Sequence, residues 1–240
     1  MRKIKILDLY GQALGLNGEE KNITAFGKRL EEMGYEYEIS EQGVGDEINT
    51  EGFDIVFMTH GKPCNIAAVS EHFAKYKEHV LSQIEAGQPF VVTGSAAMLM
   101  GKGFRLLDGK EYPGLGLMDC RSEEFDGLFV GGAVLAPDFA PEEKVYGVYY
   151  RFADVIFDSP NEKPLFKAVY SYGMGGKPVE KEEGLHYKNL FASWSLGPML
   201  ARNPVMMREV LKPVLREDYK ETDFSLEEKA VGMIISELMK

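Results

Sequence analysis

Cysteine and positive charge are both scarce in this sequence. The 240 residues include two cysteines, Cys64 and Cys120. Such usage is typical of a chain whose thiols stay reduced, so we expect a cytoplasmic location. Lys and Arg number 27 against 38 Asp and Glu, and the basic residues form no run. The resulting net charge of -11 repels nucleic acid, which we exclude as a partner.

Long apolar segments are missing as well. No stretch approaches the roughly 20 apolar residues that a membrane-spanning helix requires, so we expect no membrane span. The chain also passes directly from Met-Arg-Lys into a strand pattern, without an apolar signal region. Hydrophobic residues nevertheless make up 45% of the chain. The length and composition predict a single globular domain over residues 1–240.

The apolar segments that are present alternate between strand and helix patterns. Strand patterns cover residues 3–10 and 53–58, and helical spacing covers residues 23–33 and 66–84. A third apolar strand follows the second helix. This alternation predicts an α/β fold with a three-layer, doubly wound, mainly parallel sheet. Residues 104–191 consist of short strand-like runs between Gly, Pro and acidic turns, which predicts a strand-rich, antiparallel second half.

The third strand leads into a tight bend that has the layout of a nucleophile elbow. The segment, residues 89–101, reads PFVVTGSAAMLMG. In such elbows a Ser or Cys stands on a strained turn above the sheet. Here the turn reads Gly-Ser-Ala-Ala, and no cysteine lies within twenty residues of it. Ligands of doubly wound sheets bind beyond the C-terminal strand ends, so residues 59–63 and 93–97 are predicted to form one site.

Five segments, taken in order, carry a resemblance to a known family. They read LDLYG with KNITAFGKRLEEMG, FDIVFMTHGKP, PFVVTGSAAMLMG, GLGLMD and EGLHYKNLFASWSLGPMLARNP. Together they resemble the class I glutamine amidotransferases of the cobyric acid synthase type, and most closely the amidotransferase subunits of lipid II isoglutaminyl synthase. The resemblance spans nearly the whole chain. It implies a flavodoxin-like fold and a Cys-His pair that hydrolyses glutamine.

The resemblance also implies that both catalytic positions are substituted. The family elbow reads Cys-Gly-Gly-Tyr-Gln-Leu-Leu-Gly, and with its last glycine on Gly101 the nucleophile position is Gly94. The family's second motif, Tyr-Leu-His-Gly-Pro-Leu-Leu, aligns on Gly197-Pro198 and places the histidine position on Leu196. Glycine has no nucleophile and leucine transfers no proton, so glutamine hydrolysis of this type is not expected.

Two further departures concern the neighbouring binding groups. The family's oxyanion loop has three glycines, but Thr59 and His60 stand in two of those positions and Gly61 alone remains. Side chains there would crowd the backbone amides that stabilise an oxyanion. The family also has an arginine for the glutamine carboxylate near the position of Leu128.

These observations leave several hypotheses open. The leading one is an amidotransferase-like protein without the catalytic Cys and His, which binds a small molecule in the degenerate glutamine pocket or acts as a subunit beside a synthetase. The resemblance implies a Mur-ligase-like partner. The alternative is an active hydrolase or amidotransferase whose nucleophile has moved. A third is a dimerisation scaffold without a ligand. The candidate pocket comprises His60, Gly61, Cys64, Thr93, Gly94, Ser95 and Leu196.

The relocated chemistry would use either of two groups. His60 and Cys64 lie four residues apart after a central strand and face the same crevice, so they are one candidate dyad. Ser95, next to the turn, is the other candidate nucleophile. A thiol or hydroxyl within about 3.5 Å of an imidazole would favour this alternative.

No metal or cofactor is expected. His72 and His79 are seven residues apart in a helix pattern, but no third ligand accompanies them, so we predict surface residues. The glycine clusters at residues 15–18 and 173–176 lack the lysine and hydroxyl of a phosphate-binding loop and are predicted to be turns. Cys120 and Trp194 are predicted to be buried.

Overall fold

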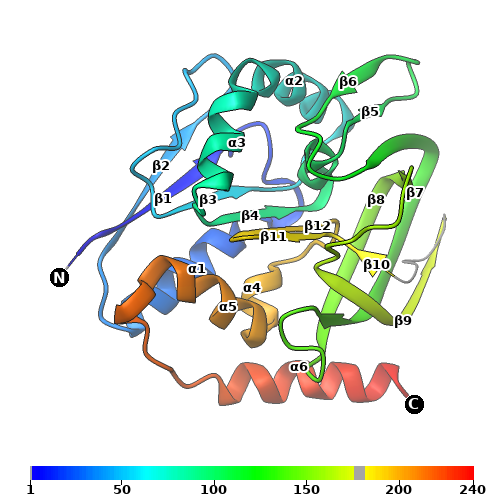
Figure 1. The fold of residues 1–240 in the computed structure, drawn as a ribbon. Coiled ribbons are helices and arrows are strands. Elements are labelled where there is room, and N and C mark those ends of the chain that lie inside the picture. Colours follow the sequence, from blue (N-terminus) through cyan, green and yellow to red (C-terminus); the bar gives the residue numbers. More distant parts are fainter. Residues whose placement is uncertain (1, 176–181) are drawn as a thin grey trace.

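The computed structural model describes residues 2–175 and 182–240, which form two sheets (Figure 1). Within this part of the chain, sheet A has six strands in the order β11-β12-β4-β3-β1-β2. They are β1 (Ile4–Leu9), β2 (Tyr37–Gln42), β3 (Ile55–Met58), β4 (Phe90–Thr93), β11 (Leu185–Tyr187) and β12 (Leu190–Ser193). Every neighbouring pair is parallel except β11 with β12. The parallel strands have the order of a doubly wound, flavodoxin-like sheet, as predicted.

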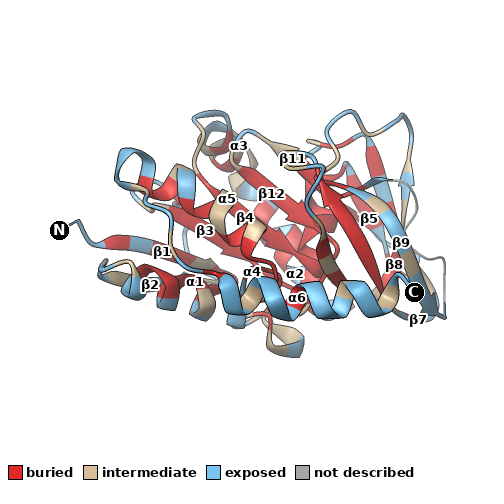
Figure 2. Ribbon diagram, turned by 90° about the horizontal axis from the view of Figure 1, so that it is seen from below, coloured by how far each residue is buried: buried red, intermediate tan, exposed pale blue. Residues whose placement is uncertain are grey.

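Helices cover both faces of sheet A and complete the three layers (Figure 1). One face carries α2 (Pro63–Phe73) and α3 (Lys77–Glu85). The other carries α1 (Lys21–Glu32), α4 (Met199–Arg202) and α5 (Pro204–Leu215). Every residue of β3, β4 and β12 is buried, as the red central strands of Figure 2 show. This double-sided burial is why these strands are continuous apolar runs.

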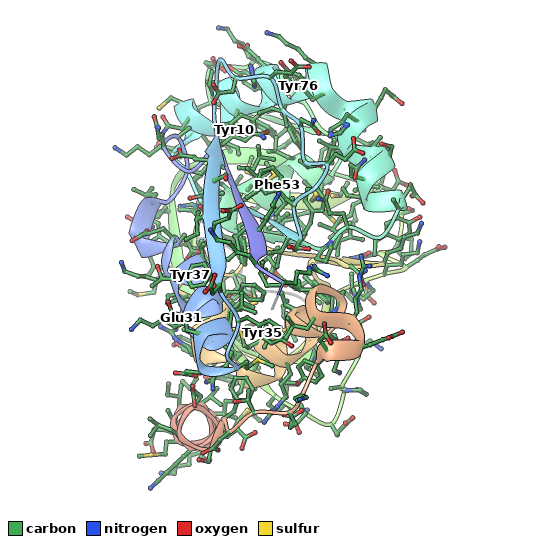
Figure 3. The ribbon with its side chains drawn as sticks, turned by 90° about the vertical axis from the view of Figure 1, so that its left-hand side faces the viewer. Tyr10, Glu31, Tyr35, Tyr37, Phe53 and Tyr76 are labelled. Carbon is green, nitrogen blue, oxygen red and sulfur yellow. The ribbon has the colours of Figure 1, made fainter. Side chains whose placement is uncertain are left out.

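The helix predicted over residues 66–84 is divided in two by a 3-10 turn at Ala74–Tyr76. Its apolar face is as predicted, because Ile66, Val69, Phe73, Val80 and Ile84 are all buried. The break coincides with tertiary contacts that periodicity does not report. The Tyr10 ring packs edge-on against Phe73 with centroids 6.0 Å apart, and the Tyr76 hydroxyl donates to the Asp46 carbonyl at 3.3 Å. Figure 3 labels both tyrosines.

Strand β2 packs through Tyr37, whose ring lies against α1 (Figure 3). A Cβ atom on Gly27 of α1 would lie 2.5 Å from the Tyr37 ring. Glycine therefore allows the ring to approach the helix backbone. Strand β2 extends over Tyr37–Gln42 and pairs in parallel with β1 along six residues.

Sheet B forms the second half of the fold. Its strands are β5 (Gly103–Arg105), β6 (Glu111–Pro113), β7 (Cys120–Pro137), β8 (Val145–Phe157), β9 (Phe166–Met174) and β10 (Glu182–Glu183). The order is β10-β9-β7-β5-β6, and β8 pairs with the other edge of β7. Of these pairs only β5 with β7 is parallel, so the strand-rich second half is confirmed. The end of the predicted range departs from the antiparallel pattern, because β11 and β12 join sheet A and β12 is parallel to β4. Core residues of both sheets pack in one hydrophobic cluster.

The last helix, α6 (Ser225–Leu238), lies across the lower side of the molecule (Figure 2). Of its residues only Val231 is buried. The remaining short helices are 3-10 turns at Leu16–Gly18, Gly94–Met100 and Arg216–Asp218. The turn at Gly94–Met100 is entirely buried and follows β4 directly, which places it at the centre of the candidate site.

Candidate functional site

Three loops meet at the C-terminal ends of β3, β4 and β12, which are neighbours in sheet A. Met58 pairs with Val92 and Ser193 pairs with Thr93, so the strands end at nearly the same level. Parallel strands bring their carboxyl ends to one edge of the sheet, where ligands of this fold class bind. The structure therefore brings together the loops that begin at residues 59, 94 and 194.

Gly94 forms the turn of the elbow and is in direct contact with Leu196. Its φ of 61° is in the left-handed region that favours glycine. A Cβ atom added to Gly94 would overlap the Leu196 side chain and would lie 2.7 Å from the Cβ of His60. Leu196 is held by its amide, which donates to the Val148 carbonyl at 2.6 Å. The positions that the resemblance assigns to nucleophile and base are thus adjacent, and neither carries a reactive group.

The His60 side chain points into the elbow, where it is bonded to the backbone. Its Nδ1 accepts a hydrogen bond of 3.1 Å from the amide of Ser95, the residue that follows the turn. Burial lowers the pKa of His60 to about 4. The imidazole is therefore neutral near pH 7, with Nδ1 as its acceptor and its proton on Nε2. In an elbow, the amide of the residue after the nucleophile donates to the oxyanion. Here that amide, of Ser95, already donates to His60.

The Ser95 hydroxyl accepts a hydrogen bond from a second amide of the same region, that of Gly61. The Gly61 amide donates to the Ser95 hydroxyl at 2.9 Å, and that hydroxyl donates back to the Gly61 carbonyl at 2.9 Å. Ser95 is 5% exposed, so both bonds are shielded from water. The hydroxyl proton is thus directed to a carbonyl and not to an imidazole nitrogen. In this arrangement Ser95 connects two loops.

Glu19 joins the elbow strand to the loop after β12, and sequence reasoning did not identify it. The Thr93 hydroxyl donates to its Oε2 at 2.7 Å, and the Gly197 amide donates to its Oε1. Asn22 donates to Oε2 at 3.2 Å. Burial raises the pKa of Glu19, whereas the hydrogen bonds from Thr93 and Gly197 oppose the rise. No local pattern marks this role of Glu19, because the two partners that join the loops lie 74 and 178 residues away in the chain.

The two cysteines differ in environment. Cys64 is exposed at the start of α2, and its thiol hydrogen-bonds to Asn65 Oδ1 at 3.4 Å. The His60 ring is 2% exposed and is bonded to Ser95, so the two members of the candidate dyad face different surroundings. Cys120 is buried, as predicted, and burial raises the pKa of its thiol to about 12.

The cavity that remains at the elbow is about 10 Å³. Its walls are His60, Gly94, Ser95, Met98, residues 150–153 and Trp194. A cavity of this size holds about one water molecule. A glutamine side chain therefore does not fit unless the surrounding side chains move.

Arg151 and Trp194 are two polar residues of the elbow wall, and sequence reasoning connected only Trp194 with the site. Trp194 is 6% exposed, as predicted for a buried residue. The Arg151 guanidinium lies 4.8 Å from the Phe129 ring centroid, and the two residues are register partners on β8 and β7. An arginine thus approaches this region from β8, whereas Leu128 stands at the position where the resemblance implies one. Sequence reasoning missed Arg151 because it lies in none of the five segments that carry the resemblance.

The two helix histidines have structural roles, and the prediction of surface positions is wrong for His72. His72 is buried, with Nδ1 3.0 Å from the hydroxyl of Tyr10, which directly follows β1. His79 accepts a hydrogen bond of 3.0 Å from the Thr50 amide. Within residues 2–175 and 182–240, no group of three or more His, Cys, Asp or Glu residues is arranged to hold a metal ion.

Two other sequence features can be placed. Gly15 and Gly18 have φ values of 94° and 80°; Gly15 precedes a 3-10 turn and Gly18 is its last residue, as predicted for that cluster. Of the second cluster, Gly173 lies in β9, Gly175 has a φ of 88°, and Gly176 lies outside the described residues. None of the helices in the described part of the chain is long and apolar enough to cross a bilayer.

Comparison with known proteins places this geometry in context. No model of a protein family matches the chain. The GatD subunit of the glutamine-hydrolysing lipid II isoglutaminyl synthase of Streptococcus pneumoniae is 26% identical over 219 residues, which are 90% of this chain and 82% of the relative. The GatD subunit of Staphylococcus aureus is 25% identical over 203 residues, which are 85% of this chain and 81% of the relative.

Solved structures agree on the fold. PurLQS from Thermotoga maritima superposes with a TM-score of 0.60 at 11% identity, covering 90% of this chain and 99% of the other. A glutamine amidotransferase crystal structure superposes with a TM-score of 0.52 at 17% identity, covering 87% of this chain and 98% of the other. The chain has a class I glutamine amidotransferase-like fold and is a distant homologue of the GatD subunit of lipid II isoglutaminyl synthase.

Proposed function

We propose that this protein is a non-catalytic member of the amidotransferase group, a single domain that binds a ligand or serves as a subunit beside a synthetase. The observation that carries the proposal is the contact between Gly94 and Leu196 at the elbow. In an active enzyme of this type a thiolate attacks the side-chain amide of glutamine, and a base activates the thiol and protonates the departing ammonia. Here the two positions that face each other offer a hydrogen atom and an isobutyl group.

The occupied oxyanion region supports the same conclusion. Two amides are placed to stabilise a developing oxyanion, those of Gly61 and Ser95, and each already donates to a side chain of the protein. Loss of a single oxyanion donor typically lowers kcat by about 10²–10³. Loss of one member of a catalytic unit typically costs several orders of magnitude more. Together these changes argue against useful glutaminase activity.

The alternative of a relocated nucleophile has less support from the geometry. In the described residues, the Cys64 thiol bonds to Asn65 and the Ser95 hydroxyl bonds to Gly61, so neither is hydrogen-bonded to an imidazole. The pKa of His60, lowered to about 4 by burial, also makes it a weak base at neutral pH. The assay below includes variants of both groups.

The subunit role rests on the relatives. Both curated relatives are subunits of a glutamine-hydrolysing synthase and align with most of this chain. A Mur-ligase-like or other synthetase is accordingly the partner that we propose, acting in the cytoplasm, where the two free thiols would stay reduced.

The deciding experiment measures ammonia release from glutamine. We expect none above background from the wild type, from Cys64→Ser or from Ser95→Ala. Restoring the pair requires Gly94→Cys with Leu196→His, and freeing the Ser95 amide requires His60→Gly as well. We expect ammonia release from the triple variant above that of the double variant. Clear turnover by the wild type, abolished in Cys64→Ser or Ser95→Ala, would contradict the proposal.

A further inference from the structure

A groove of about 1180 Å³ adjoins the closed elbow. It is lined by β7, β8, β9, β10 and Trp194, and two residues, Arg151 and Trp194, line both the groove and the elbow cavity. Ligand sites commonly have volumes of about 300–1,000 Å³. The groove is therefore large enough for a ligand bigger than one amino acid, whereas the elbow is not.

Two buried polar groups of the groove lining lack a hydrogen-bond partner among the described residues. They are the Tyr149 hydroxyl and the Trp194 indole Nε1. Tyr149 is 0% exposed and Trp194 is 6% exposed. Buried polar groups are nearly always paired, and an unpaired one costs about 1–3 kcal/mol. Both groups can donate a hydrogen bond to an acceptor oxygen of a ligand.

The groove is also strongly acidic. Among the described residues, the acidic residues of the lining are Glu123, Glu124, Asp154, Asp158, Glu182 and Glu183, and the basic one is Arg151. Part of this charge is balanced, because Asp158 pairs with Lys102 at 2.8 Å and Asp154 lies 3.8 Å from Arg151. Glu123 and Glu182 have no ion-pair partner in the described part of the chain. Excess negative charge in a groove favours a cationic ligand.

The arrangement of the carboxylates and the aromatic lining favour an organic cation over a metal ion. The carboxylates are not clustered as metal ligands in the described residues. Aromatic side chains, Phe125, Phe157 and Tyr170, complete the wall and can contact an apolar stem or a cation through their faces.

We propose that the groove binds a short basic peptide segment, with its ammonium or guanidinium group toward Glu123 and Glu182 and its carbonyl oxygens accepting hydrogen bonds from Tyr149 and Trp194. The inference rests on the proposed binding role of the chain. It places the ligand beside the elbow and separated from it by Trp194 and Arg151.

Trp194 is the one tryptophan of the sequence, so its fluorescence reports on the groove directly. The full-length protein is titrated with the capped tripeptide acetyl-Ala-Lys-Ala-amide. The matched control peptide replaces lysine by norleucine, which keeps the apolar stem and removes the charge. We expect a saturable change with the lysine peptide that weakens as salt rises, and at least tenfold weaker binding of the norleucine peptide.

Variants test the hydrogen bond from Tyr149 separately from the charge interaction with Glu123 and Glu182. Tyr149→Phe removes the unpaired hydroxyl and should weaken binding about threefold to tenfold while leaving the melting temperature unchanged or higher. Glu123→Gln with Glu182→Gln should weaken binding and reduce its salt dependence. The control Tyr35→Phe removes a hydroxyl that donates to the Asp218 carbonyl at 3.0 Å outside the groove, and it should bind as the wild type does.

Three results would overturn the inference: no saturable signal at millimolar lysine peptide, equal affinity for both peptides, or wild-type affinity in Tyr149→Phe. The ammonia assay is independent of this titration. Peptide binding together with wild-type glutaminase activity would overturn the proposed function alone. If the protein neither binds the peptide nor releases ammonia, the groove assignment alone is overturned.

Discussion

Replacing Gly94 with alanine tests how tightly the elbow is closed. The backbone φ of 61° costs a residue with a Cβ atom about 1–2 kcal/mol relative to glycine. The added methyl group would also overlap Leu196 and lie 2.8 Å from His60 Nδ1, and such overpacking costs about 1–3 kcal/mol. We therefore expect Gly94→Ala to lower the free energy of unfolding by about 2–5 kcal/mol.

Urea unfolding followed by Trp194 fluorescence measures this change, and Gly34→Ala is the matched control. Gly34 has a φ of 86°, but a Cβ atom there would meet nothing within 4 Å. The control should therefore cost the conformational part alone, about 1–2 kcal/mol. For a chain of this size each kcal/mol corresponds to about 2–4 °C in melting temperature.

A double-mutant cycle with Leu196→Ala assigns the excess to the contact. Leu196→Ala by itself should cost about 2–5 kcal/mol because Leu196 is 3% exposed. In that background Gly94→Ala should cost less than it does in the wild type, because the overlap with Leu196 is gone and only the close approach to His60 remains. If Gly94→Ala and Gly34→Ala are equally destabilising in the wild-type background, the elbow has room for a side chain and our reasoning about its closure is refuted.

Three further predictions concern the groups around the elbow. His60 binds a proton below about pH 6.5 in the unfolded chain but only below about pH 4 in the folded chain, so the free energy of unfolding should fall as the pH drops through this window. The fall should be about 3 kcal/mol larger in the wild type than in His60→Asn. If the free energy of unfolding changes equally in the two proteins from pH 7 to pH 4, this prediction is refuted. Thr93→Val removes the hydroxyl that donates to the Glu19 carboxylate at 2.7 Å and should lower the free energy of unfolding in urea by about 1.5–3 kcal/mol. In the control Thr24→Val the lost hydroxyl bond, of 3.3 Å, is exposed, and the cost should be under about 0.5 kcal/mol. Equal costs would contradict the structural role of Glu19. Iodoacetamide should label Cys64 in the folded protein and leave Cys120 unlabelled until urea is added, as peptide mass spectrometry can check, and rapid labelling of Cys120 in the folded state would contradict its burial.

The fold was largely predictable because its signals are local. Apolar runs such as residues 53–58 and the glycine and proline that punctuate them identify buried parallel strands without reference to the rest of the chain. The elbow at Gly94 was predictable for the same reason. The division of the helix at Ala74–Tyr76 and the burial of His72 were not, because both depend on Tyr10, which lies more than 60 residues away.

By itself the sequence determined the layered sheet, the strand-rich second half and the absence of a thiol at the elbow turn and of an imidazole at the position of Leu196. These follow from residue identity and from spacing along the chain. Only the tertiary structure decided that the His60 side chain accepts from the Ser95 amide and the Ser95 side chain from the Gly61 amide. It also decided that Glu19 joins the two loops and that the open groove lies beside the elbow. Those features depend on which distant side chains meet after the strands pair, and hydrogen bonds spanning 34 to 178 residues leave no periodic signal in the sequence.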